Sequence, residues 1–113
     1  MRFFFLTFTL IFSSLSNAFE IEERAYFGSE TAKSKLKIIS TADIKYFSPM
    51  INSFLERNPN HRIDYTVASS TDVMNAMYGS QTSYDLIISS AMDLQVKLAN
   101  DGFATTYKPN INI

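Results

Sequence analysis

Cysteine is absent from all 113 residues of the sequence. This absence excludes disulfides, thiol nucleophiles, thiolate metal sites and a lipid-modified cysteine. Glycine is scarce, and the isolated Gly28, Gly79 and Gly102 form neither common phosphate-binding fingerprint. The single histidine, His61, has no partner at helical spacing, and we interpret it as a surface residue. The sequence contains no Ser/His/Asp arrangement or metal-ligating cluster, so we expect no enzymatic activity, metal or cofactor.

An excess of positive charge is also missing. Lysine and arginine number 10 against 11 acidic residues, which leaves a net charge of -1. Nucleic acid is therefore not an expected partner, because its phosphates require a basic surface. Hydrophobic residues make up 46% and charged residues 19%, which is typical of a globular chain. The length suffices for one small domain.

The apolar run near the amino terminus is too short to span a membrane. It covers residues 3–12, whereas a spanning helix needs about 20 residues. Arg2 precedes the run, and small residues follow at Ser16 and Ala18, which is the pattern of an export signal. We therefore predict a signal peptide over residues 1–18, cleaved after Ala18, with no permanent membrane anchor. The predicted compartment is the periplasm of a Gram-negative cell.

Three strand-like runs follow a charged segment without periodicity, residues 19–35, which we interpret as a surface leader. The runs are residues 36–40, 62–67 and 84–89, and a helix-like segment follows each. The first and third runs are nearly continuous apolar stretches, which are typical of strands buried on both faces of a parallel sheet. The second alternates apolar and polar residues, so we expect an edge strand there.

Start and stop signals mark the helices. Ser48 and Pro49 predict the start of the first helix, with residues 43–47 as a possible extra turn, and Asn58-Pro59 predicts its end. For the second helix, Ser69 is the expected cap and Asp72 the residue that returns the bond.

The third helix repeats this arrangement with Ser90 and Asp93. Alternating strands and helices predict an α/β fold with a doubly wound, mainly parallel sheet and right-handed crossovers. Three βα units make an incomplete sheet, so we expect a partial lobe over residues 36–108 and a short truncated tail at 109–113. The exposed edge of such a sheet predicts low stability for the chain alone.

Small hydroxyl-bearing residues follow every predicted strand, at residues 40–43, 68–71 and 89–92. Ligands of open parallel sheets bind at the carboxyl ends of the strands, beside helix amino termini. These loops predict a donor-rich surface for an anion or a polar solute, without a strong nucleophile or base. Helix capping alone also explains Ser69, Ser70 and Ser90, and a solvated helix start explains Asp43.

Two long stretches resemble a known family. LKIISTADIKYFSPMINSFLERNPNHRIDYTVASSTDVMNAM and YDLIISSAMDLQVKLANDGFATTY are similar to the amino-terminal part of an extracellular solute-binding protein of an ABC importer, nearest the iron(III) and polyamine type. The resemblance covers about residues 36–108, and the block DLIISSAMDLQ at residues 85–95 carries most of it.

The resemblance implies a type II periplasmic binding protein fold, whose two lobes close on a small solute and deliver it to a permease in the inner membrane. Position by position, it implies that the cleft is lined by Thr41, Ala42 and Asp43 from the first loop, Ser69 and Ser70 from the second, and Ser89 and Ser90 from the third. The rest of the first lobe, the hinge and the second lobe have no counterpart in these residues. We therefore expect a truncated binding protein without a metal site, because the ferric members use tyrosines of the second lobe.

An exported sensory or interaction module is the alternative, since the same fold is reused for sensing. A permease gene beside the coding sequence would favour transport, and a sensor kinase gene would favour signalling.

Overall fold

The computed structural model describes residues 21–79 and 83–106. In chain order the elements are β1 (Glu23–Gly28), β2 (Ser34–Ser40), α1 (Ile44–Arg57), β3 (His61–Val67), α2 (Ser70–Gly79), β4 (Leu86–Ile88) and α3 (Met92–Asn100). The predicted signal peptide, its cleavage after Ala18 and the tail at 109–113 lie outside the described residues. Within the described ranges, no helix is long and apolar enough to cross a membrane.

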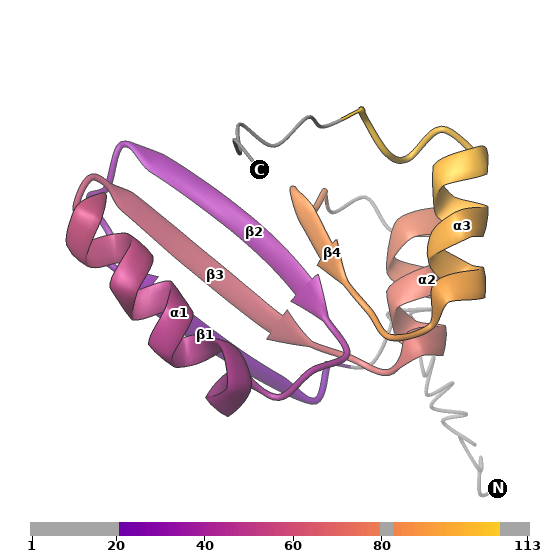
Figure 1. The fold of residues 1–113 in the computed structure, drawn as a ribbon, viewed down its shortest axis with the longest axis horizontal. Coiled ribbons are helices and arrows are strands. Elements are labelled where there is room, and N and C mark those ends of the chain that lie inside the picture. The colour runs from indigo at the N-terminus through magenta and orange to yellow at the C-terminus, as the bar shows by residue number, and fades with distance from the viewer. Residues whose placement is uncertain (1–20, 80–82, 107–113) are drawn as a thin grey trace, which may run out of the picture.

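The strands form one sheet in the order β1-β3-β2-β4 (Figure 1). β2 runs parallel to both β3 and β4, and β1 runs antiparallel to β3. Each of the three parallel strands is followed by a helix. The prediction of an α/β fold with a mainly parallel sheet and three βα units is confirmed.

β1 corrects the interpretation of residues 19–35 as a surface leader. It pairs with β3 from Glu23 opposite Val67 to Gly28 opposite Arg62, so this segment contributes a strand. Phe27 packs against the core beneath α1. The strand escaped prediction because only Ala25 and Phe27 supply apolar residues on its inner face, too few to give a periodic signal.

β3 is an interior strand, and the prediction of an edge strand is wrong. It lies between β1 and β2, and its residues Ile63, Tyr65 and Val67 are buried. The alternation arises because its other face is partly polar. There the Arg62 Nε donates to the Asp64 carboxylate at 2.6 Å, and the guanidinium lies over the Tyr26 ring. Alternation therefore marked a strand with one polar face, which an interior strand can have.

Two apolar clusters cover opposite faces of the sheet. One joins Ile38 to Ile51 of α1, and the other joins Ile39 to Val73 and Ala76 of α2. Because neighbouring residues of a strand point to opposite faces, Ile38 and Ile39 define a three-layer arrangement. Figure 1 shows α1 on one side and the pair α2 and α3 on the other. The interior strand β2 therefore contributes to the core on both faces of the sheet.

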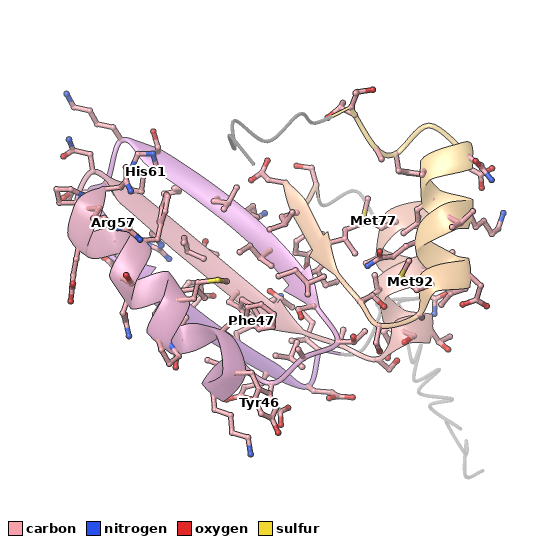
Figure 2. All side chains as sticks on the ribbon, in the orientation of Figure 1. Tyr46, Phe47, Arg57, His61, Met77 and Met92 are labelled. Atoms are coloured by element: carbon pink, nitrogen blue, oxygen red, sulfur yellow. The ribbon has the colours of Figure 1, made fainter. Side chains whose placement is uncertain are left out.

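α1 begins earlier than its sequence signals predict. Its first residue is Ile44 and Pro49 lies inside it, so the predicted start at Ser48-Pro49 is wrong, whereas the extra turn offered for residues 43–47 is present from Ile44 on. Ile44 and Phe47 both pack against the core, and this burial extends the helix over the turn before the proline. Figure 2 shows Phe47 toward the sheet, whereas Tyr46 is exposed. The predicted end is confirmed, because α1 stops at Arg57, just before Asn58-Pro59.

The caps of the other two helices differ from each other. The Asp72 N–H donates to Ser69 Oγ at 3.1 Å, and that hydroxyl donates to the Asp72 carboxylate at 2.7 Å, which confirms the predicted cap of α2. The predicted Ser90 cap of α3 is wrong. Ala91 occupies the N-cap position without a side-chain bond, and its N–H donates to Ser89 Oγ at 3.1 Å. The local turn is thus held by the serine one position earlier.

Candidate functional site

The carboxyl ends of β2, β3 and β4 meet at one edge of the sheet. Ser40, the last residue of β2, is in register with Val67 of β3 and with Ile88 of β4. Beyond the register, Ala68 N–H donates to Ser40 O at 2.9 Å and Thr41 N–H donates to Ile88 O at 3.0 Å. The three parallel arrows point toward this same end in Figure 1. The structure therefore brings the three hydroxyl-bearing loops together, and we call this end of the sheet the carboxyl edge.

The first loop, residues 41–43, is fixed by its own backbone contacts. Ala42 N–H donates to Ser40 Oγ at 2.9 Å, and Ala42 O accepts from the Tyr65 hydroxyl at 2.9 Å. Thr41 is half-buried, and Asp43, which precedes α1, is exposed and makes no side-chain capping bond. The hydroxyl of Thr41 and the carboxylate of Asp43 are therefore available to a ligand.

The second loop contains one engaged serine and one free serine. Ser69 uses its hydroxyl as acceptor and as donor toward Asp72, so capping accounts for it. Ser70, the first residue of α2, is half-buried, and among the described residues no hydrogen bond reaches its side chain. The structure thus separates two serines that their positions in the sequence could not distinguish.

This difference predicts unequal effects of two neighbouring substitutions on stability. Ser69→Ala removes a helix cap and should lower the free energy of unfolding by about 0.5–2 kcal/mol. Ser70→Ala removes no hydrogen bond and should change it by less than about 0.5 kcal/mol. Urea unfolding followed by circular dichroism measures both. Equal losses in the two variants would contradict the cap assignment.

The third loop presents Ser90 to solvent. Ser89 accepts the Ala91 N–H through its hydroxyl and the Gln95 amide through its carbonyl, the latter at 2.7 Å. Ser90 is exposed, and its side chain bonds to nothing else in the described part of the chain. Its hydroxyl is free for a ligand, whereas the Ser89 oxygen already accepts one bond. Of the seven predicted site residues, Thr41, Asp43, Ser70 and Ser90 have side chains that bond to no other described residue.

The acidic residues Asp43, Glu22 and Glu23 lie at this edge. Of these, the sequence pattern predicted only Asp43 there. Glu22 N–H donates to Val67 O at 2.9 Å, and Glu23 is in register with Val67, so β1 starts at the carboxyl edge. Both glutamates are exposed, as is Asp43. The position of these glutamates follows only from the pairing of β1 with β3, because the two segments are far apart in the sequence. The edge combines helix amino termini, which favour anions, with carboxylates, which favour cations.

His61 lies at the other end of the sheet, at the start of β3 (Figure 2). It is half-buried rather than at the surface, its Nδ1 is buried without a hydrogen-bond partner, and its ring packs edge-on against Phe54 with centroids 5.6 Å apart. Residues 21–79 and 83–106 contain no group of three or more metal-ligating side chains. His61 is thus a packed ring remote from the candidate site.

A hollow of about 540 Å³ opens between β4, α2, α3 and residues 103–105. Its lining is mostly apolar, with Met77, Leu98 and Phe103 among its residues, and it includes none of the seven predicted site residues. Its two strongest polar groups are already engaged. Asp85 accepts the Lys37 N–H at 2.8 Å, and Gln95 donates to Ser89 O. The hollow offers mainly apolar surface together with Tyr84 and Thr105, while the seven predicted site residues lie at the carboxyl edge.

An open, mostly parallel sheet with polar loops at the carboxyl ends of its strands is the ligand-binding arrangement of many α/β proteins. The chain is similar to the substrate-binding protein of an ABC transporter from Agrobacterium tumefaciens, a crystal structure, with a TM-score of 0.66 and 32% sequence identity. The likeness covers 79% of this chain and 28% of that chain. The structural neighbour is thus a transporter binding protein, of which this chain spans less than a third. No protein-family profile and no curated protein matches the chain.

Proposed function

We propose that this chain is a substrate-binding protein, or the amino-terminal portion of one, that captures a small polar or anionic solute for an ABC importer. The observation that carries the proposal is the meeting of three hydroxyl-bearing loops at one edge of a parallel sheet. The similarity to a transporter binding protein at 32% identity supports the same conclusion. The proposed partners are the solute and, for the full-length protein, a permease in the inner membrane.

The proposed ligand site comprises Thr41, Ala42, Asp43, Ser69, Ser70, Ser89 and Ser90. Within it we assign direct solute contacts to the unengaged side chains of Thr41, Asp43, Ser70 and Ser90. Ser69 and Ser89 hold the turns that present their neighbours. Hydroxyl groups both donate and accept, so this set suits a solute with several polar groups. It contains no activated nucleophile, which agrees with binding rather than catalysis.

The charges at the edge bear on the kind of solute. The amino termini of three helices supply N–H groups that favour an anion, but Glu22, Glu23 and Asp43 oppose a high negative charge. A neutral or weakly charged polar solute meets both demands, and an amine-bearing solute would gain from the carboxylates. Of the two solute types inferred from the resemblance, polyamines carry the amines that these carboxylates favour, whereas iron(III) would need ligands from a second lobe.

Export to the periplasm completes the proposed role, because importer binding proteins act outside the inner membrane. Its basis is the signal pattern of residues 1–18. Amino-terminal sequencing of protein from the periplasmic fraction tests it, with Phe19 expected as the first residue. Recovery of a product that starts at Met1 in the membrane fraction would contradict the proposed location.

We expect weak binding by the 113-residue chain on its own. Each hydrogen bond exchanged with water contributes about 0.5–1.5 kcal/mol, and association costs about 4 kcal/mol or more. The four assigned contacts therefore leave at most about 2 kcal/mol, which corresponds to a dissociation constant of roughly 30 mM or weaker. Titration calorimetry with phosphate, ferric citrate, spermidine and succinate measures it for each class of solute.

The variants Ser70→Ala and Ser90→Ala should weaken whichever of these interactions is observed. Ser34→Ala is the matched control, because Ser34 starts β2 at the opposite end of the sheet. A submicromolar dissociation constant that survives both site substitutions would overturn the site assignment. Absence of binding to every one of these solutes at concentrations of about 100 mM would count against the proposed function.

A further inference from the structure

Three hydroxyl-bearing side chains are buried in the sheet, namely Ser40, Tyr65 and Thr66, and the first two lie deepest. Ser40 is 0% exposed and Tyr65 is 1% exposed, on the neighbouring strands β2 and β3. A buried hydroxyl is costly unless it is hydrogen-bonded. Alanine and phenylalanine would fill the same space without that cost. The hydrogen-bond partners of the Ser40 and Tyr65 hydroxyls therefore indicate the role of these two residues.

Both hydroxyls contact the same residue of the candidate site. Ser40 Oγ accepts the N–H of Ala42 at 2.9 Å, and the Tyr65 hydroxyl donates to the carbonyl of Ala42 at 2.9 Å. The N–H and the carbonyl of Ala42 are thus both bound by buried side chains. Tyr65 reaches this loop from 23 residues further along the chain.

The first loop is consequently attached to all three parallel strands. Ser40 holds it from β2, Tyr65 holds it from β3, and Ile88 of β4 accepts the Thr41 N–H at 3.0 Å. The Tyr65 ring is itself fixed, since it packs against Phe47 with centroids 5.9 Å apart. A loop held from three sides loses little freedom when it binds a ligand.

Electrostatics keep the Tyr65 hydroxyl in the donating form. Burial raises the pKa of Tyr65, the negative charge of Asp43 raises it further, and the hydrogen bond with Ser40 lowers it by a smaller amount than burial raises it. The Tyr65 hydroxyl is therefore protonated at neutral pH, as an ordinary tyrosine is, and it can donate to the carbonyl of Ala42.

We propose that Ser40 and Tyr65 are positioning residues. They fix the backbone of Ala42 through its N–H and its carbonyl, and thereby set the placement of Thr41 and Asp43 in the ligand site. The inference rests on the proposed function, but the hydrogen bonds of Ser40 and Tyr65 with Ala42 are present without a ligand. Neither residue was among the predicted site residues. Ser40 ends an apolar run and Tyr65 alternates within a strand, so nothing in the sequence marks their contacts with Ala42.

Amide hydrogen exchange measured by NMR tests the inference in the full chain. Ser40→Ala and Tyr65→Phe should each speed exchange in residues 41–43 by about two- to tenfold, the loss expected for one hydrogen bond. The matched controls are Ser34→Ala at the other end of β2 and Tyr26→Phe on the exposed face of β1, neither of which should alter this loop. For any of spermidine, ferric citrate, phosphate or succinate that binds, the two positioning variants should weaken binding by a similar factor.

Unchanged exchange in residues 41–43, with a general loss of protection elsewhere, would overturn the inference and leave both residues as core residues. Ser40→Ala deletes a single oxygen, so it decides the question even if Tyr65→Phe fails to fold. Faster exchange without binding of any tested solute would support positioning and contradict the proposed function. The two failures are therefore distinguishable.

Discussion

Ile39→Ala should destabilise the protein by about 2–5 kcal/mol, the range for removing a buried isoleucine side chain down to its first carbon. Ile39 is 0% exposed and lies on the central strand β2, where it packs with Val73 and Ala76 of α2. The substitution leaves a cavity between the sheet and that helix. The free energy of unfolding of a small domain is about 5–15 kcal/mol, so the expected loss is a large share of it. Urea unfolding followed by circular dichroism measures it.

Two controls define the expected scale for Ile39. Ile39→Val removes one methyl group and should cost about 0.5–1.5 kcal/mol. Val96→Ala, on α3, concerns a side chain that is 54% exposed and should cost less than about 0.5 kcal/mol. An Ile39→Ala loss no larger than that of Val96→Ala would show that the second face of the sheet is not packed as described.

Gly28→Ala should produce the second large loss, for two additive reasons. Gly28 has a φ of +96°, and a Cβ built on it would lie 2.6 Å from the backbone oxygen of His61. The conformation alone costs a residue with a side chain about 1–3 kcal/mol. The clash adds to it, because the contacted atom belongs to the backbone of β3 and moves only if the pairing of β1 with β3 shifts.

The other glycines separate these two causes. Gly102 also has a positive φ, +87°, but an added Cβ meets nothing within 4 Å, so Gly102→Ala should show only the conformational cost. Gly79 has neither constraint, and Gly79→Ala should be neutral or stabilising by up to about 1 kcal/mol. The free energy of unfolding should therefore be highest for Gly79→Ala, lower for Gly102→Ala and lowest for Gly28→Ala. A harmless Gly28→Ala would contradict the placement of β1 beside β3.

The sequence predicted the three βα units because apolar runs and helix signals are local. Continuous apolar runs at Leu36 and Leu86 marked β2 and β4, and the Ser69 and Asp72 pair marked the start of α2. The expectation that the third run is buried on both faces is wrong, because β4 lies at the edge of the sheet and Leu86 is 45% exposed. β1 lacked such a signal because its neighbours in the sequence are charged and it becomes a strand only through its pairing with β3. The start of α1 was misplaced because tertiary packing of Ile44 overrode the preference of proline for a first turn.

The sequence predicted that the three loops meet at one edge, but it did not indicate which side chains in them are already hydrogen-bonded. Parallel strands bring their carboxyl ends together whatever their order, so the meeting of the loops followed from the fold class. Local bonds, such as those of Ser69 with Asp72 and Ser89 with Ala91, decide which serine hydroxyls are engaged. The contacts of Tyr65 with Ala42 and of Glu22 with Val67 instead join segments that are distant in the sequence. The strand order that supplies these partners has no local signature.

The central claim is that the carboxyl edge of the sheet is the surface that recognises a polar solute. Backbone amide NMR shifts, recorded while spermidine, ferric citrate, phosphate and succinate are added in turn to the folded chain, test this claim most directly. The account predicts that at least one of these solutes produces saturable shifts that are largest in residues 41–43, 69–70 and 89–91. Largest shifts around the hollow between β4 and the α2–α3 pair, or no shift with any of these solutes, would contradict it.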